Sequence, residues 1–163
     1  MIVIVIMGVI YTLAITNLNT VAKKQEDAIP TIKNLKQFLL RFEFKNKIEF
    51  VCLAQQSNCF VILDNKTEKS IDEEFEKSEI LAYRYNLLEG LREVAFEPYF
   101  DSNNIEKDVT FSYTLYKDKT GDQVIFVLDN KAYDYTSYLE DVVVYDSPEL
   151  FVQTKEQLLQ KVL

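Results

Sequence analysis

The chain of 163 residues contains no histidine and no tryptophan, and only three glycines and two cysteines. Without histidine, a protein lacks the commonest general base and every Ser-His or Cys-His catalytic arrangement. The glycines, Gly8, Gly90 and Gly121, are too far apart to form a glycine-rich phosphate loop. Two cysteines without histidine also make a poor zinc site. The sequence therefore predicts no catalytic residue, no metal ligand and no cofactor, and hence a protein that is not an enzyme.

Positive charge is scarce as well. The chain carries 18 lysines and arginines against 26 acidic residues, which gives a net charge of -8. A negative field over most of the surface opposes contact with a phosphate backbone, so we expect no direct binding of nucleic acid. With 48% hydrophobic residues, the chain is long enough for one globular domain with a core and one appended segment.

The longest apolar run lies at the start of the chain. From Ile2 to Ile15 nearly every residue is apolar, and the first charged residue is Lys23. As a helix this run would rise about 21 Å, whereas the hydrocarbon core of a bilayer is about 30 Å thick. No basic residue precedes the run, as one would in a secretory signal peptide, and no basic flank fixes its topology. Since both deficits lie on the N-terminal side, we expect further residues upstream of Met1.

The segment MIVIVIMGVIYTLAITNL resembles the N-terminal helix of type IV pilins and type II secretion pseudopilins. After a Phe-Thr-Leu-Ile-Glu opening, that family continues as Met-Ile-Val-Val-Ala-Ile-Ile-Gly, and a second apolar block ends in Pro-Asn-Leu. Residues 1–8 match the first part and residues 17–18 match the end, while Thr16 stands where many members have proline. The resemblance implies that Met1 is an internal methionine, with a basic leader, a peptidase site and the family's glutamate upstream.

The resemblance implies an α+β fold, in which a long N-terminal helix packs on an antiparallel β-sheet and a C-terminal helix follows. Residues 1–18 would be the membrane-embedded, filament-core part of the helix. Residues 19–42 would be a soluble stalk helix with a break near Pro30, and residues 43–163 a β-rich periplasmic domain. The side chains expected in the membrane and the filament core are Ile2, Val3, Ile4, Val5, Ile6, Met7, Gly8, Val9, Ile10, Leu13 and Ile15.

In function, the resemblance implies a structural subunit, a minor pseudopilin or pilin, in the bacterial inner membrane. Its filament would serve type II secretion, a type IV pilus or DNA uptake, and its partners would be other pilin-like subunits and the assembly platform. Two alternatives stay open. For the segment, the apolar run is also compatible with an ordinary signal anchor or an uncleaved signal peptide. For the function, the alternative to a filament subunit is a membrane-anchored periplasmic interaction module with no filament.

Helical periodicity appears at both ends of the soluble part. Ile32, Leu35, Phe38, Leu39 and Phe42 recur at helical spacing and predict an amphipathic helix, as in the stalk of a pilin or the first helix of any α+β domain. Near the C-terminus, a serine at 147 followed by a proline at 148 has the order of an N-cap and a first helical residue. We therefore expect a terminal helix there.

The cysteines lie in the first of several strand-like segments. Residues 47–54 and 59–64 are rich in β-formers and are joined by the polar residues 55–58, which predicts a hairpin with Cys52 opposite Cys59. Opposed residues in a non-hydrogen-bonded pair lie near disulfide distance. In an oxidising periplasm this candidate disulfide would form, and the alternative is a pair of buried thiols in a reducing compartment.

The rest of the chain predicts more strands and two acidic features. Two strands flank residues 86–90, and residues 108–146 alternate as an antiparallel meander with a turn at Gly121. Ser70 and Glu73 have the spacing of a capping box and predict a short helix, whose acids either meet a basic partner or form a solvated face. The segment KDKTGD, residues 117–122, lacks the spacing and terminal glutamate of a calcium-binding EF-hand loop, so we expect a hairpin turn.

Overall fold

The computed structural model describes residues 29–54, 59–71, 75–76, 78–137 and 141–161. In this part of the chain the structure is mostly antiparallel β-sheet, with one short helix near its start and one longer helix at its end. The elements are α2 (Leu35–Leu39), β1 (Lys47–Leu53), β2 (Cys59–Leu63), β3 (Lys66–Ile71), β4 (Leu81–Asn86), β5 (Gly90–Val94), β6 (Tyr99–Phe100), β7 (Glu106–Lys107), β8 (Val109–Tyr116), β9 (Ile125–Leu128), β10 (Lys131–Asp134), β11 (Val143–Tyr145) and α3 (Pro148–Gln160).

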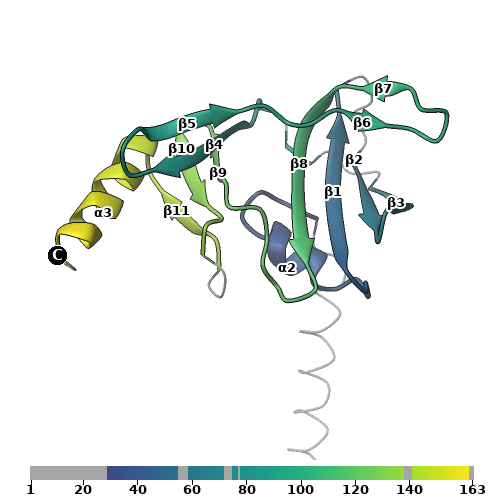
Figure 1. Ribbon diagram of the computed structural model, residues 1–163, viewed down its shortest axis with the longest axis horizontal. Helices are drawn as coiled ribbons and strands as arrows, with labels where there is room; N and C mark the ends of the chain where they lie inside the picture. Colours follow the sequence, from purple (N-terminus) through teal and green to yellow (C-terminus); the bar gives the residue numbers. More distant parts are fainter. Residues whose placement is uncertain (1–28, 55–58, 72–74, 77, 138–140, 162–163) are drawn as a thin grey trace, which may run out of the picture.

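The strands form two main sheets (Figure 1). One has four strands in the order β3-β2-β1-β8, and the other has five in the order β11-β10-β9-β4-β5. Strands β6 and β7 form a small separate ribbon. Helix α2 lies near β1 and β8, whereas α3 lies at the far end of the five-stranded sheet, beside β10 and β11.

Two of the hairpin turns have the same sequence. Leu-Asp-Asn-Lys occurs at residues 63–66, between β2 and β3, and again at residues 128–131, between β9 and β10. In both turns the central Asp and Asn have positive φ, between 48° and 68°. This is the backbone of a type I′ turn, which matches the twist of the flanking strands and favours Asn and Asp at its centre. The same four residues therefore set the pairing of β2 with β3 and of β9 with β10.

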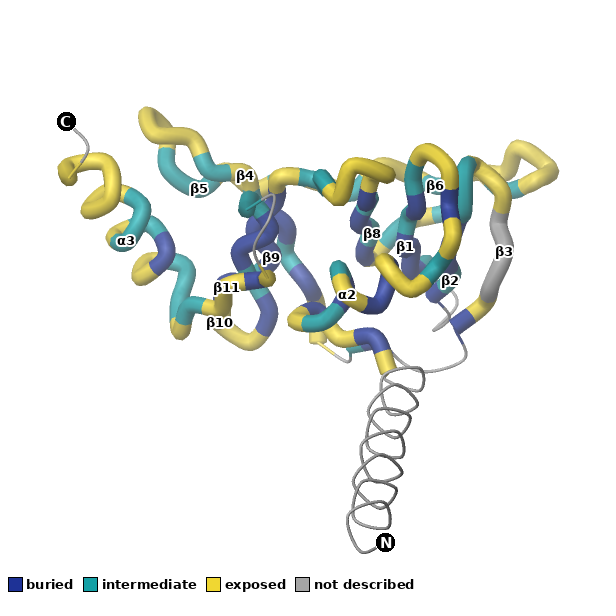
Figure 2. The backbone as a smooth tube through the Cα atoms, turned by 90° about the horizontal axis from the view of Figure 1, so that it is seen from below, coloured by how far each residue is buried: buried dark blue, intermediate teal, exposed yellow. Residues whose placement is uncertain are grey.

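The core lies between the two sheets and is rich in aromatic rings. Phe111 of β8 contacts Phe126 of β9 with ring centroids 4.8 Å apart, which joins one sheet to the other. Tyr113 and Tyr135 continue this contact at 4.7 Å. Aromatic pairs in such tilted arrangements add to the stabilisation that comes from burial alone. Figure 2 shows buried residues at the centre of both sheets, whereas the turn between β4 and β5 and the outer turns of α3 are exposed.

The expected pilin-like α+β fold, with a long N-terminal helix packed on one sheet, is wrong. The described residues begin without helix, and α2 has only five residues. The helix starts only at Leu35 because the residues before it form a turn, in which Asn34 N–H bonds to Thr31 O and the Asn34 side-chain oxygen accepts from Thr31 N–H. The helix also ends early, with Arg41 N–H bonded to Phe38 O and Phe42 N–H to Leu39 O, in the tighter i to i-3 pattern.

The buried stripe of this predicted helix is nevertheless present. Ile32, Leu35, Phe38 and Leu39 are all buried in the core, and Phe42 packs against it. These residues therefore belong to the same folded domain as the strands. Of the two helices described, neither is long and apolar enough to span a membrane.

Other sequence predictions met mixed outcomes. The hairpins β1–β2 and β4–β5 are confirmed, and so is the second half of the expected meander, β9–β10–β11. Its first strand is wrong, because β8 pairs with β1 in the other sheet and not with β9. The C-terminal helix is also confirmed, because Ser147 Oγ accepts a hydrogen bond from Leu150 N–H and Pro148 is the first residue of α3. The helix expected to start at Ser70 is wrong. Ser70 lies in β3, opposite Phe60 of β2, where pairing with a neighbouring strand outweighs a local capping preference.

Candidate functional site

The residues predicted to form a site fall into two groups. The membrane and filament-core side chains, Ile2 to Ile15, lie outside the described residues. Cys52 and Cys59 lie opposite each other on β1 and β2, are both buried, and are joined by a disulfide. Their Cα atoms are 4.1 Å apart, which is typical of a non-hydrogen-bonded antiparallel pair. The bond closes the end of the β1–β2 hairpin.

A cavity of about 660 Å³ opens beside this disulfide, between strands of the two main sheets. Its described walls come from the end of β1, the start of β2, residues 75–76 and 78–80 with the start of β4, the end of β5 with residues 95–96, and the start of β8. Cavities of about 300 to 1,000 Å³ are the usual size of ligand sites in proteins. We call this space the seam cavity, because it lies between the four-stranded and the five-stranded sheet.

The inner wall of the seam cavity is apolar. Phe75, Phe96 and Phe111 all line it, and their rings touch: Phe75 is 4.8 Å from Phe111 and Phe96 is 5.8 Å from Phe111, centroid to centroid. Phe75 and Phe111 are buried, and Phe96 is half-buried. Ile80 adds an aliphatic side chain from the loop before β4. Such a wall favours an apolar group over a bare ion.

The charged residues in the described walls of the seam cavity are all acidic. Glu76, Glu79 and Glu93 line it, and none of the described lining residues is a lysine or arginine. Glu79 and Glu93 are exposed at the rim. Glu76 is half-buried and accepts a hydrogen bond of 3.1 Å from the backbone N–H of Ile32. The cavity therefore combines an aromatic wall with a negative rim.

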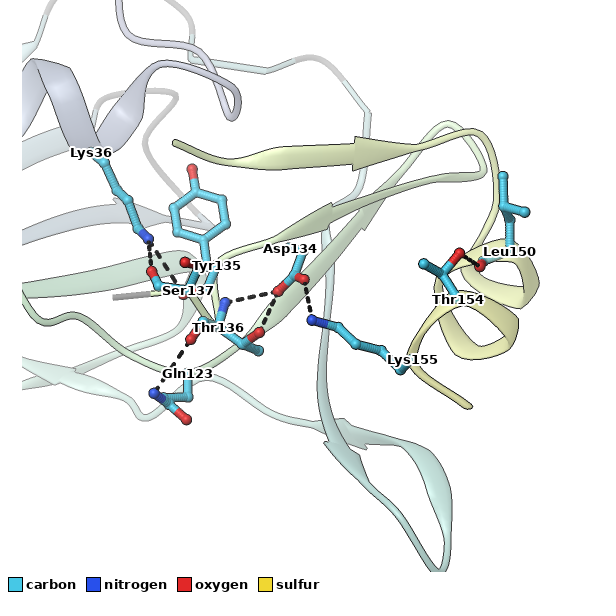
Figure 3. Close-up of polar contacts among 9 residues, drawn as sticks. All are labelled: Lys36, Gln123, Asp134, Tyr135, Thr136, Ser137, Leu150, Thr154 and Lys155. Atoms are coloured by element: carbon cyan, nitrogen blue, oxygen red, sulfur yellow. Dashed lines mark hydrogen bonds and ion pairs between the residues drawn. The ribbon is translucent and has the colours of Figure 1, made fainter. Parts of the chain in front are cut away.

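Figure 3 shows the polar contacts at the end of β10, which hold α3 on the sheet. Asp134 is only 3% exposed and forms an ion pair of 2.9 Å with Lys155 of α3. The other carboxylate oxygen accepts hydrogen bonds from the N–H and hydroxyl groups of Thr136, at 2.8 and 2.6 Å. Lys155 also lies 5.3 Å from the centre of the Phe151 ring. Each polar group of the buried carboxylate thus has a partner, as its burial requires.

The next residues of the same segment hold α2. Lys36 Nζ donates a hydrogen bond of 2.7 Å to the carbonyl of Ser137 and lies 5.4 Å from the centre of the Tyr135 ring. Burial lowers the pKa of Lys36, although the negative charge of Asp134 acts in the opposite direction. The Tyr135 hydroxyl donates to the carbonyl of Ile32. Burial raises the pKa of Tyr135, so this hydroxyl keeps its proton. Residues 134–137, at the end of β10, therefore contact both α2 and α3.

The acidic turn after β8 is a hairpin turn, as the sequence predicts. The Asp118 carboxylate accepts from the N–H and the hydroxyl of Thr120, and these bonds lower its pKa. Asp122 accepts from the N–H of Thr114, 2.9 Å away. Both carboxylates therefore close the turn. In the described part of the chain, no group of three or more Cys, Asp or Glu residues is arranged to hold a metal ion.

Comparison of the chain with known protein families, curated proteins and solved structures finds no match. The seam cavity was not predicted from the sequence, because its walls come from five separate segments. Glu76 lies in the run of acidic residues after Ser70, for which the sequence offered two interpretations: contact with a basic partner or a solvated face. Glu79, Glu93 and the three phenylalanines gave no signal, since a glutamate on a strand rim and a core phenylalanine have the same local patterns in any β-domain.

Proposed function

We propose that this protein is a non-catalytic assembly subunit of the bacterial inner membrane, with its β-rich domain in the periplasm. In this proposal it is a minor pilin-like subunit of a secretion, pilus or DNA-uptake filament. The single observation that carries the proposal is the resemblance of residues 1–18 to the N-terminal helix of pilins and pseudopilins. The proposal depends on this segment and not on the fold of the described domain.

Physical chemistry supports a double use for such a segment. In a bilayer, apolar side chains contact lipid tails, and in a filament the same side chains contact equivalent helices of neighbouring subunits. Exchanging one apolar environment for another changes the free energy little, so one helix serves first as an anchor and then as a filament core. The disulfide between Cys52 and Cys59 fits an oxidising compartment such as the periplasm.

The experiment is mass spectrometry of the N-terminus of the protein isolated from its native cells. We expect a mature N-terminus that has been cleaved and methylated, a few residues ahead of the apolar run. The matched control is a strain without the prepilin peptidase, in which an unmethylated leader should stay attached. An identical, unprocessed N-terminus in both strains contradicts the filament proposal, and so does an in-frame stop codon directly before the codon of Met1.

The seam cavity favours a second candidate, a membrane-anchored periplasmic interaction module with no filament. In that case the cavity and its acidic rim carry the function, and the apolar segment only tethers the domain. Copurification separates the two. A filament subunit is recovered with other pilin-like subunits after gentle extraction, whereas a tethered module is recovered without them.

A further inference from the structure

We propose that the seam cavity binds an extended segment of a partner protein, in which an apolar side chain stands next to a lysine or arginine. This inference deepens the proposed function, because it assigns a class of partner to the periplasmic domain. It rests on that function only in taking the ligand to be a protein. The argument has three parts: the shape of the cavity, its charge and the strand beside it.

The cavity has room for a side chain and walls that suit an apolar one. Its volume, about 660 Å³, exceeds what a single water or ion fills, and three touching phenyl rings from Phe75, Phe96 and Phe111 line its inner side. An aliphatic or aromatic group placed against these rings would be removed from water, and each buried methylene would contribute about 0.8 kcal/mol. An apolar anchor is therefore the group that gains most from this site.

The negative charge of the rim determines which type of partner residue binds next to the apolar side chain. Glu79 and Glu93 are exposed at the mouth, and no lysine or arginine contributes to the described walls. A partner carboxylate would be repelled, whereas a lysine or arginine would lay its apolar stem along the wall and keep its charge beside the glutamates.

The strand beside the cavity favours a peptide over a small amine. Strand β5 is the edge of the five-stranded sheet, and Glu93 and Val94 at its end, with Ala95 and Phe96 after it, line the cavity. An edge strand offers backbone groups that pair with an added strand. A peptide paired with β5 would run across the mouth, and alternate side chains would point toward the cavity and away from it.

The test uses the full-length chain in lipid nanodiscs and a phage-displayed library of random peptides. Selection is made on the wild type after counter-selection on Ala95→Trp, a substitution at an exposed residue that fills the cavity mouth. We expect the enriched peptides to carry lysine or arginine beside an aliphatic or aromatic residue. A labelled copy of the most enriched peptide should bind Ala95→Trp more than about tenfold more weakly, with the thermal unfolding of the variant unchanged.

A matched pair of charge variants separates specific binding from attraction to an acidic protein. Glu93 lines the cavity, whereas Glu97 is also exposed, four residues further on, and does not line it. We expect Glu93→Gln to weaken binding about threefold, and Glu97→Gln to leave it unchanged. Equal effects of the two variants, enrichment of acidic peptides or no enrichment at all would overturn the inference. None of these results depends on how the N-terminus is processed, so the inference and the proposed filament function can fail separately.

Discussion

The contact between Tyr113 and Gly121 gives the sharpest prediction about stability. Tyr113 lies on β8 with its side chain fully buried, and among the described residues its hydroxyl has no hydrogen-bond partner. Its burial, with the nearby charge of Asp122, raises the pKa, so the group stays protonated. A buried hydroxyl without a partner costs about 1 to 3 kcal/mol. Because the ring contacts to Phe126 and Tyr135 do not use the hydroxyl, Tyr113→Phe should stabilise the protein by about 1 kcal/mol.

Gly121 provides the second half of a double-mutant cycle. A Cβ atom at this position would lie 2.0 Å from the Tyr113 hydroxyl oxygen and 2.7 Å from Cζ of the same ring. Gly121→Ala should therefore destabilise the domain by about 2 kcal/mol, as overpacking of a core does. In the double variant the closest of these clashes is gone but the contact with Cζ is still short. The cycle should thus show a coupling of about 1 kcal/mol and incomplete rescue.

The assay is thermal and denaturant unfolding of the four proteins, followed by circular dichroism. A gain of about 1 kcal/mol corresponds to a rise in Tm of about 3 °C for a domain of this size. Additive effects of the two substitutions would refute the predicted clash. Destabilisation by Tyr113→Phe would show that the hydroxyl has a partner, such as a bound water, and would refute the account of its burial.

Three further predictions concern other contacts. Replacing Cys52 and Cys59 together by serine should lower the free energy of unfolding by about 2 kcal/mol, as expected for so short a loop, and urea unfolding under reducing conditions should no longer differ between the variant and the wild type. Asp134→Asn keeps the shape of the side chain but removes the charge beside α3, so stability should fall by about 2 kcal/mol, and hydrogen exchange should rise first in that helix; an evenly distributed rise would contradict this anchoring role. The carboxylate of Asp64 accepts backbone N–H bonds from residues 45–47, which lower its pKa. These bonds stabilise the folded protein at pH values above the pKa of Asp64 in the unfolded chain, which is about 4. The stabilisation is lost as the pH falls through the lower pKa that Asp64 has in the folded protein. An NMR titration of the carboxyl should therefore have a midpoint below that of a free aspartate, and Asp64→Asn should flatten the loss of stability in acid.

Local signals predicted those elements whose partners are close in the chain. The β1–β2 hairpin, with Cys52 opposite Cys59, and the capped start of α3 at Ser147 needed only turn chemistry, strand alternation and an N-cap. The stripe from Ile32 to Leu39 was correctly predicted to be buried. Its length as a helix was not, because side-chain spacing fixes which face is buried, whereas the turn before Leu35 and the i to i-3 bonds after Leu39 fix how far the helix extends.

Competition with neighbouring strands decided what local preference left open. Ser70 has capping-box spacing to Glu73, but it pairs with Phe60 of β2 and is therefore part of strand β3. The seam cavity shows the same limit more strongly. Phe75, Phe96 and Phe111 are separated by 15 residues or more in the chain, and only the tertiary fold brings their rings together.

The sequence by itself determined the absence of histidine chemistry, the apolar opening segment, the acidic charge and most strand positions, because each is a property of composition or of neighbours along the chain. The tertiary structure alone decided that the strands divide into two sheets and that an aromatic wall and an acidic rim meet in one cavity. These features depend on contacts between distant residues, whose free energies no local pattern contains.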